Sequence, residues 1–268
     1  MSDATSVRAG SARVSPVLAA VAASLPISLR IASDAVAVAI DGAGDWATEV
    51  LQALEGGARG AVVHRPCVQS CEALEKLVDA ARELGASVML RGSWDQHPSL
   101  ASLGDALAQR DEVHLIDCLA SGARAQPWSP LFDQLLFVLR HIGPVAKLTC
   151  DYMAETGYIV RAETVADRVP VALTWAADGL GPKLDMRLVG RGSMMQVVVE
   201  DDERWLPLHA IRFDDRGEHR FAPDWESADR AIWRRMHQAT ASNGADIADL
   251  ELALQALYAI DTMRGPAR

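Results

Sequence analysis

The chain has 268 residues, half of them hydrophobic and 5% aromatic, and its formal net charge is −10. This acidic balance, with no basic block to offset it, argues against a general nucleic-acid binder. The length suits one large domain or two modest ones with ample material for a core. Four scattered cysteines (Cys67, Cys71, Cys118 and Cys150) are too few for a disulfide framework.

The N-terminal region carries no targeting or membrane signal that we recognise. Residues 1–15 are small, polar and weakly basic, and we expect them to form a disordered tail. Val17–Leu29 is rich in alanine but is interrupted by Ser24, Pro26 and Ser28, so it falls short of the roughly 18–20 apolar residues of a membrane span. Without a convincing cleavage site, the sequence favours a cytoplasmic protein.

Residues 16–125 alternate between strand and helix patterns. A short helix over 16–25 is followed by strands at Ile27–Ala32 and Ala35–Ile40. After a glycine turn, Trp46, Val50 and Leu54 line one face of a second helix. This alternation favours a mostly parallel sheet with helices on its faces, which is a Rossmann-like domain.

The segment Gly60–Trp94 gives the clearest pattern within that domain. An apolar strand ends at His64-Arg65-Pro66, and Ser70 then caps an amphipathic helix that stops at Gly85. A second strand, Ser87–Leu90, ends in Arg91-Gly92-Ser93.

The pattern changes in residues 126–268. Pro130–Ile142 is a strongly apolar helix closed by Gly143-Pro144. Several strands with alternating apolar residues follow, which is typical of an antiparallel sheet with one wet face. A last helix runs from about Asp246 to Arg264. We therefore predict a Rossmann-like mostly parallel sheet domain followed by an α+β domain with an open antiparallel sheet.

This order of elements resembles that of the Gfo/Idh/MocA oxidoreductases. Three local features carry the resemblance: the turn at Pro66 with the helix that ends at Gly85, the sequence Leu131–Leu136 before Gly143-Pro144, and the strand and turn Leu188–Ser193. The resemblance implies a nicotinamide cofactor bound by the first domain. It also implies that the open sheet of the second domain mediates oligomer contacts.

The residues that such oxidoreductases use for catalysis have no counterpart at the matched positions. The lysine of their Glu-Lys-Pro turn is matched to Gly92, and the histidine after the turn proline to Ser70. In the helix before the sheet, the histidine and aspartate positions fall on Pro130 and Gln126 when the helices are matched at Asp133. Because hydride transfer from a carbinol needs a nearby base, we assign no catalytic residue.

A glycine-rich turn is the candidate cofactor site. Gly42-Ala43-Gly44-Asp45-Trp46-Ala47 matches G-x-G-x-x-A, and Arg65, followed by Pro66, ends the next strand where it could meet a 2′-phosphate. We thus predict NAD or NADP at Gly42, Gly44, Arg65 and Pro66. Two observations oppose this reading: Asp45 puts a carboxylate where a phosphate should lie, and bulky Trp46 crowds the same turn. An Asp at a helix start is ordinarily a cap. The reading is also incompatible with matching Pro66 to a later strand.

Two other polar groups are better explained without a ligand. His64, Cys67 and Cys71 could form a metal site, but a fourth ligand is not evident, and we expect no metal. His209 and His219 lie near Asp214, Asp215 and Glu218, where a solvated charged hairpin is favoured over a substrate patch.

Two functions from different classes remain open. The first is a non-catalytic auxiliary or structural subunit that assembles with a full-length oxidoreductase paralogue, as a homo- or hetero-oligomer through the C-terminal sheet. Apolar Val189, Val198 and Ile211 on the outer sheet face favour it. The second is an active NAD(P)-dependent dehydrogenase or reductase of a sugar, polyol or related small carbonyl compound. Under either function we expect the protein to bind neither nucleic acid nor a membrane.

Overall fold

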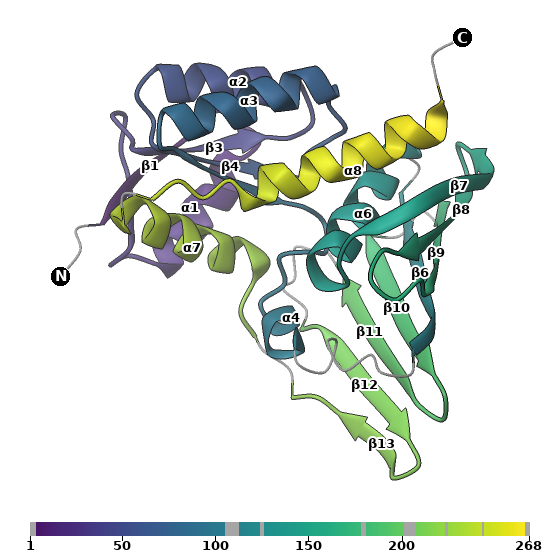
Figure 1. The fold of residues 1–268 in the computed structure, drawn as a ribbon. Helices are drawn as coiled ribbons and strands as arrows, with labels where there is room; N and C mark the ends of the chain where they lie inside the picture. The colour runs from purple at the N-terminus through teal and green to yellow at the C-terminus, as the bar shows by residue number, and fades with distance from the viewer. Residues whose placement is uncertain are drawn as a thin grey trace. The chain divides into compact units, whose positions relative to one another are not determined.

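The computed structural model describes residues 4–104, 113–123, 126–177, 181–200, 207–222, 225–242 and 244–265. The chain forms two compact units (Figure 1). The first comprises residues 1–92 and 228–257, and the second comprises residues 93–227 and 258–268. The boundary expected at residue 126 does not match this division, because Val113–Gly122 pairs with strands of the second unit and Ala228–Ser242 packs in the first.

The first unit contains a five-stranded parallel sheet in the order β2-β1-β3-β4-β5. Its strands are β1 (Thr5–Ala9), β2 (Leu29–Ile31), β3 (Ala37–Asp41), β4 (Gly60–His64) and β5 (Ser87–Arg91). Every residue of β4 and β5 is buried, which fits parallel strands covered by helices on both faces.

The strand β1 corrects the expectation of a disordered tail over residues 1–15, of which residues 1–3 lie outside the described part. Thr5–Ala9 lies in the middle of the sheet, between β2 and β3. Its polar side chains find partners inside the unit. Ser6 Oγ accepts the Val36 amide at 3.0 Å, and Thr5 Oγ1 lies 3.1 Å from Thr240 Oγ1. Polar residues that are hydrogen-bonded in this way are stable in a core, although their composition suggests a tail.

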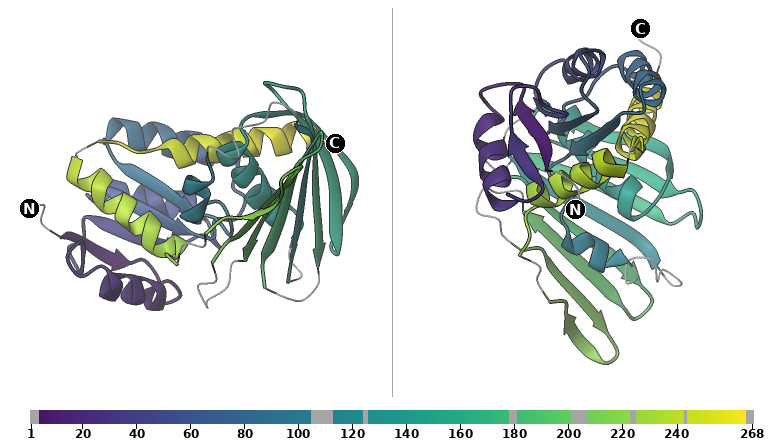
Figure 2. Two further views of the ribbon diagram at one scale, coloured as in Figure 1. Left: turned by 90° about the horizontal axis from the view of Figure 1, so that it is seen from below. Right: turned by 90° about the vertical axis from the view of Figure 1, so that its left-hand side faces the viewer.

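Four helices and the start of a fifth cover the first sheet. They are α1 (Ser15–Ser24), α2 (Trp46–Glu55), α3 (Cys71–Glu83), α7 (Ala228–Ser242) and α8 (Ala248–Arg264). Helices α2 and α3 pack side by side, and α1 packs against α7 (Figures 1 and 2). Ser70 Oγ accepts the Ala73 amide at 3.2 Å, so the predicted cap of α3 is confirmed.

The free edge of β5 is closed by the segment that leads into α8. The Val88 amide donates to the carbonyl oxygen of Asp246, and the Leu90 amide donates to Asp249 Oδ2, both at 2.9 Å. Asp249 is fully buried and also pairs with Arg235 at 2.9 Å. An open sheet edge invites pairing with other chains, and these bonds remove that liability.

The second unit contains an eight-stranded sheet in the order β13-β12-β11-β10-β6-β9-β8-β7. All its pairings are antiparallel except that of β6 with β9. Its strands are β6 (Val113–Gly122), β7 (Val145–Ala154), β8 (Gly157–Thr164), β9 (Pro170–Ala177), β10 (Lys183–Gly190), β11 (Met194–Glu200), β12 (His209–Asp214) and β13 (Gly217–Arg220). The predicted fold class is thereby confirmed.

Helix α6 (Trp128–His141) covers one face of this sheet, and a short helix α4 (Ser99–Ser102) precedes β6. The fully buried Gln134 of α6 joins three strands. Its Nε2 donates to the carbonyl oxygens of Cys118 (2.9 Å) and Thr174 (3.0 Å), and its Oε1 accepts the Tyr158 hydroxyl. A buried amide is tolerated because each of its groups is satisfied.

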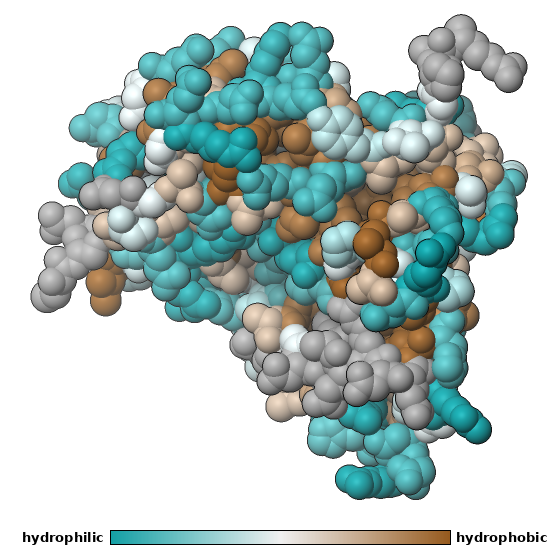
Figure 3. All heavy atoms as spheres, in the orientation of Figure 1, coloured by the Kyte–Doolittle hydropathy of each residue, from teal (hydrophilic) through white to brown (hydrophobic). Residues whose placement is uncertain are grey.

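The other face of the second sheet is partly apolar. Burial alternates along β10 and β11, so Val189 and Val198 lie on the face opposite Leu188 and Val197. Leu115 and Leu119 are 38% and 42% exposed. The surface seen in Figure 3 likewise mixes hydrophobic and hydrophilic residues.

Three further facts bear on chemistry. All four cysteines are free. Within the described ranges, no group of three or more His, Cys, Asp or Glu side chains is arranged to hold a metal ion. Among the described helices, none is long and apolar enough to cross a membrane.

Candidate cofactor and active site

The carboxyl edge of the five-stranded sheet brings together the turns that follow β1, β3, β4 and β5. From β1 the chain passes to β2 on one side and then to β3 on the other. This reversal is the topological switch point, and parallel sheets bind ligands just outside the carboxyl ends of the strands there. The turns after β1 and β3 flank it.

The sequence pattern does not indicate the turn after β1, because residues 1–15 have the composition of a tail. The Gly10 amide donates to the carbonyl oxygen of Ala39 at 2.7 Å, and a Cβ at Gly10 would lie 3.0 Å from that oxygen. Helix α1 then begins without an acidic residue in its first turn and without a side-chain cap from Val14. Its N-terminal amides and dipole therefore favour an anion. The small residues Ser11 and Ala12 after Gly10 were the available signal.

The predicted site at Gly42–Ala47 lies on the same sheet edge, but its helix end is already occupied. Asp45 caps α2 by accepting the Thr48 amide at 3.3 Å. Trp46 is fully buried, and its indole N–H donates to the Cys67 carbonyl oxygen at 2.9 Å. The N-terminus of α2 thus carries its own carboxylate, which opposes binding of a pyrophosphate.

The structure brings Gly42, Gly44, Arg65 and Pro66 into one locality. A Cβ at Gly42 would lie 2.5 Å from both the Arg65 carbonyl oxygen and Pro66 Cα, so only glycine fits there. The Gly44 carbonyl oxygen accepts Gln69 Nε2 at 3.0 Å. Gly42 therefore allows two turns to pack against each other, a task different from the predicted approach of a phosphate.

The turn His64-Arg65-Pro66 holds an exposed cation in an uncommon backbone conformation. Arg65 has φ = 52°, in the left-handed region, and its amide donates to the carbonyl oxygen of Arg91 at 2.7 Å. Pro66 is buried whereas Arg65 is exposed. A long side chain at positive φ persists only where its surroundings fix it, and such positions concentrate at functional sites.

The position of β4 changes what Arg65 can contact. Neighbouring strands lie about 4.8 Å apart, so the end of β4 is about 14 Å from the end of β2, three strands away. In doubly wound sheets the adenosine ribose lies near the end of the second strand. Arg65 is thus remote from a 2′-phosphate when the pyrophosphate lies at the switch point.

Three charged side chains meet beside this turn. Asp229 Oδ1 lies 3.3 Å from His64 Nδ1 and 3.3 Å from Arg91 Nε. Burial alone would raise the pKa of Asp229, but Arg91 and His64 outweigh it and hold that pKa well below its ordinary value. The carboxylate is therefore ionised at neutral pH.

In the second unit, helix α6 carries a different polar pair. Ser93 Oγ donates to Asp133 Oδ2 at 2.7 Å. The positions matched to the histidine and the aspartate offer no acid or base, because they are Pro130, which is buried in the helix, and Gln126, which precedes the helix. Asp133 is thus the acidic side chain that α6 contributes.

A second cluster in this unit surrounds the buried Asp95. Arg140 Nε donates to its Oδ2 at 3.0 Å, and His141 Nε2 lies 2.8 Å from its backbone carbonyl oxygen. Burial lowers the pKa of His141 to about 4. His141 is therefore neutral at pH 7 and donates through Nε2.

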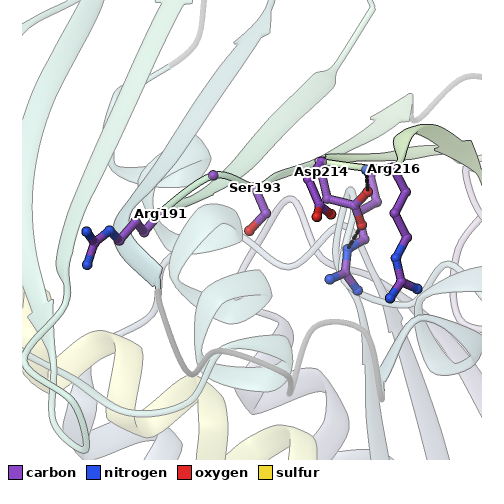
Figure 4. Close-up of a pocket in the computed structure, with 7 residues that line it drawn as sticks. Arg191, Ser193, Asp214 and Arg216 are labelled. Atoms are coloured by element: carbon purple, nitrogen blue, oxygen red, sulfur yellow. Dashed lines mark hydrogen bonds and ion pairs between the residues drawn. The ribbon is translucent and has the colours of Figure 1, made fainter.

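A polar pocket of about 520 Å³ lies between the β10–β11 and β12–β13 turns. Asp214 accepts both the Arg216 amide at 2.9 Å and Arg212 Nε at 3.3 Å. Arg191 points away from Asp214 and Arg216 (Figure 4), so the cations do not converge on one point. Together with the Arg220–Glu218 pair, this favours the predicted charged hairpin, which includes His209 and His219.

The Cys67 thiol lies beside the glycine-rich turn after β3. Cys67 Sγ donates to the Gly44 carbonyl oxygen at 3.3 Å, and burial raises the pKa of this thiol. A raised pKa leaves the sulfur protonated and poorly nucleophilic.

No protein-family model and no curated protein matches the sequence. Solved structures do match its fold. UDP-N-acetylglucosamine 3-dehydrogenase from Acidithiobacillus ferrooxidans superposes with a TM-score of 0.75 at 12% identity, covering 98% of this chain and 97% of that one. A dehydrogenase from Chromobacterium violaceum gives 0.73 at 15% identity, covering 98% and 95%.

A 3-ketoreductase from Actinomadura kijaniata, in complex with NADP and TDP-benzene, gives a TM-score of 0.70 at 14% identity, covering 99% and 90% of the two chains. The chain therefore has the fold of Gfo/Idh/MocA-type oxidoreductases, as its sequence resemblance implied. At these identities the likeness establishes the fold alone.

Proposed function

We propose that this chain binds a nicotinamide dinucleotide, NAD or NADP, and serves as a non-catalytic auxiliary subunit beside a catalytic oxidoreductase. One observation carries the proposal: the exposed cation fixed at the end of β4 is an arginine, Arg65. A guanidinium stays protonated in proteins, so it can hold an anion or stack on a ring but cannot exchange a proton.

The order of strands supports this assignment. The sheet has the doubly wound order 2-1-3-4-5. When it is matched to the other common order, 3-2-1-4-5-6, the described residues supply no strand beyond β2, and β4 takes the fifth place. His64-Arg65-Pro66 at its end then lies at the place of the Glu-Lys-Pro turn, with Arg65 at the lysine and His64 in place of the glutamate, one strand earlier than Gly92. In this match Arg65 keeps the positive charge of the lysine, but it cannot donate a proton as the lysine can.

The residues at the switch point fit a dinucleotide. The uncapped N-terminus of α1 would receive the pyrophosphate, and Gly10 permits close backbone approach. The buried Ser11 hydroxyl oxygen has no hydrogen-bond partner among the described residues, and a cofactor oxygen would satisfy it. Gly42, Gly44 and Pro66 would line the path toward Arg65.

Two charge changes at helix ends test the site. Ser15→Asp adds a carboxylate at the start of α1 and should weaken binding of NADH or NADPH several-fold, because it repels the pyrophosphate. The matched change Asp45→Ser at the start of α2 should leave the affinity unchanged. If Asp45→Ser tightens binding and Ser15→Asp does not weaken it, the cofactor lies at Gly42–Ala47 instead.

An auxiliary role requires a partner, and the outer face of the second sheet supports one. Val189, Val198 and Ile211 lie on that face with the exposed Leu115 and Leu119. An interface of the usual 1,200–2,000 Å² would cover them. Arginine at Val189 and Val198 should dissociate the homo- or hetero-oligomer while the first unit stays folded. We place this assembly in the cytoplasm, where four free cysteines are expected.

The Asp133–Ser93 pair favours a second candidate, an active dehydrogenase or reductase of a sugar, polyol or related carbonyl compound. A carboxylate on α6 can accept the proton of a substrate hydroxyl, which is the general-base role that oxidation of a carbinol requires. Turnover of such a substrate by the isolated chain, lost in Asp133→Asn, would favour this candidate over the auxiliary role.

A further inference from the structure

Asp229 joins three stretches of chain that are far apart in the sequence. It lies one residue after the chain re-enters the first unit at Ala228, and Arg91 lies one residue before the chain leaves it at Gly92. His64 ends the neighbouring strand β4, where it pairs in register with Arg91. His64 Nδ1 and Arg91 Nε both approach a single oxygen, Asp229 Oδ1, at 3.3 Å.

This cluster is largely removed from solvent. The side chains of His64, Arg91 and Asp229 are 10%, 11% and 19% exposed. Buried charges are weak evidence for stability, because well-packed apolar residues often serve as well. Their best-attested use is to select one arrangement among several.

The cluster lies directly beside a residue with an uncommon backbone conformation. Arg65 follows His64 directly, has φ = 52°, and donates its amide to the carbonyl oxygen of Arg91. Asp229 therefore holds Arg91, which supplies the accepting carbonyl group, and His64, which directly precedes the donating residue. Gly42 closes the other side, since its α-carbon faces the Arg65 carbonyl group too closely for any side chain.

His64 itself is placed to hold the turn and not to exchange protons with a substrate. Its Nδ1 faces Asp229, its Nε2 is buried, and its ring lies 6.4 Å from that of the fully buried Trp233 in α7. Asp229 and Trp233 are both residues of α7. The imidazole is thus packed beneath α7, whereas the Arg65 side chain is exposed.

We propose that Asp229 is a positioning residue: through His64 and Arg91 it fixes the backbone of Arg65, so that the Arg65 guanidinium meets the nicotinamide end of the bound dinucleotide. The contact of Arg65 with the nicotinamide end rests on the proposed function, whereas the fixing of the Arg65 backbone is independent of it.

The experiment compares Asp229→Asn with Asp246→Asn, a matched loss of a carboxylate that pairs with Arg235 in the same unit at 2.8 Å. NADH, NADPH and ADP, which lacks nicotinamide, are titrated by calorimetry, and amide hydrogen exchange is followed by mass spectrometry. Asp229→Asn should weaken dinucleotide binding about tenfold and leave ADP unchanged. Exchange should rise only at residues 64–67 and 91–92.

A double variant separates positioning from general destabilisation. If Asp229 acts through Arg65, Arg65→Ala with Asp229→Asn should bind the dinucleotide no more weakly than Arg65→Ala alone. Additive losses of affinity in the double variant would overturn the proposal. So would an Asp229→Asn variant whose dinucleotide affinity and amide exchange are unchanged, or one whose exchange is faster across the whole first unit, as in Asp246→Asn. If the unaltered protein binds no dinucleotide while Asp229→Asn loosens only residues 64–67 and 91–92, the positioning role stands and the proposed function fails.

Discussion

Gly42 and Arg65 approach so closely that a Cβ atom at residue 42 would lie 2.5 Å from the Arg65 carbonyl oxygen. The contact joins the turn after β3 to the turn after β4, and both lie at the carboxyl edge of the parallel sheet. Because the neighbouring atoms are backbone atoms, they cannot move aside as a flexible side chain would. The Arg65 turn is thereby fixed from the β3 side.

Gly42→Ala should therefore lower the free energy of unfolding of the first unit by about 1–3 kcal/mol, the usual cost of overpacking. Gly44→Ala is the matched control, because its Cβ would meet only Glu49 Oε1, at 3.9 Å. Urea denaturation of the two variants measures the difference. Equal stability of Gly42→Ala and the unaltered protein would show that the two turns are not in contact.

Asp249 is the residue whose loss should most weaken the edge of the parallel sheet. Asp249→Ala leaves the Leu90 amide without its acceptor and Arg235 without a buried partner, so we expect a loss of about 3–5 kcal/mol. Glu251→Ala removes an exposed partner of Arg82 and should cost at most about 1 kcal/mol. Hydrogen exchange at Leu90 provides a local readout. Protection of that amide in Asp249→Ala would contradict the assignment.

Gln134 should be indispensable to the second unit for a similar reason. Gln134→Leu preserves approximate volume but removes the side-chain hydrogen bonds to the Cys118 and Thr174 carbonyl oxygens and leaves the buried Tyr158 hydroxyl without its acceptor, which costs about 1–3 kcal/mol or more. Tyr158→Phe removes only the last of these bonds and should cost less. Thermal unfolding followed by near-ultraviolet circular dichroism ranks the two variants, and the opposite ranking would refute this account of α6.

His141 gives the second unit a specific pH dependence. Its pKa falls from 6.5 in the unfolded chain to about 4 in the folded one, so the unfolded state binds more protons between these values. Its contribution to stability is complete above pH 6.5 and is lost as pH falls toward 4, by up to about 3 kcal/mol. His141→Gln should flatten the slope of the melting temperature over this range. An unaltered slope in that variant would assign the dependence to the carboxylates.

Much of the fold follows from local pattern. The helix capped at Ser70 and ended by Gly85, at φ = 62°, and the alternating burial of β9 to β11 agree with the sequence predictions. Both depend on residues within one turn or one strand of each other. Such periodicity is visible without knowledge of the tertiary structure.

The site depends on contacts that local pattern does not carry. β1 was missed because Thr5 and Ser6 are polar, and their hydrogen-bond partners come from Val36 and Thr240. Because the sequence pattern does not indicate β1, it does not indicate the Gly10 turn either, and it points to the glycines after β3. Asp229 reaches His64 only through the return of the chain into the first unit.

The most direct test of the proposed function is calorimetric titration of NADH and NADPH into the pure chain, followed by an assay for oxidation or reduction of sugars and polyols. We predict saturable binding of at least one dinucleotide, with a dissociation constant of roughly 1 µM to 1 mM as for enzyme substrates. Binding should weaken in Arg65→Ala, and the chain alone should show no turnover. Absence of binding by both dinucleotides at millimolar concentration would contradict the proposed function.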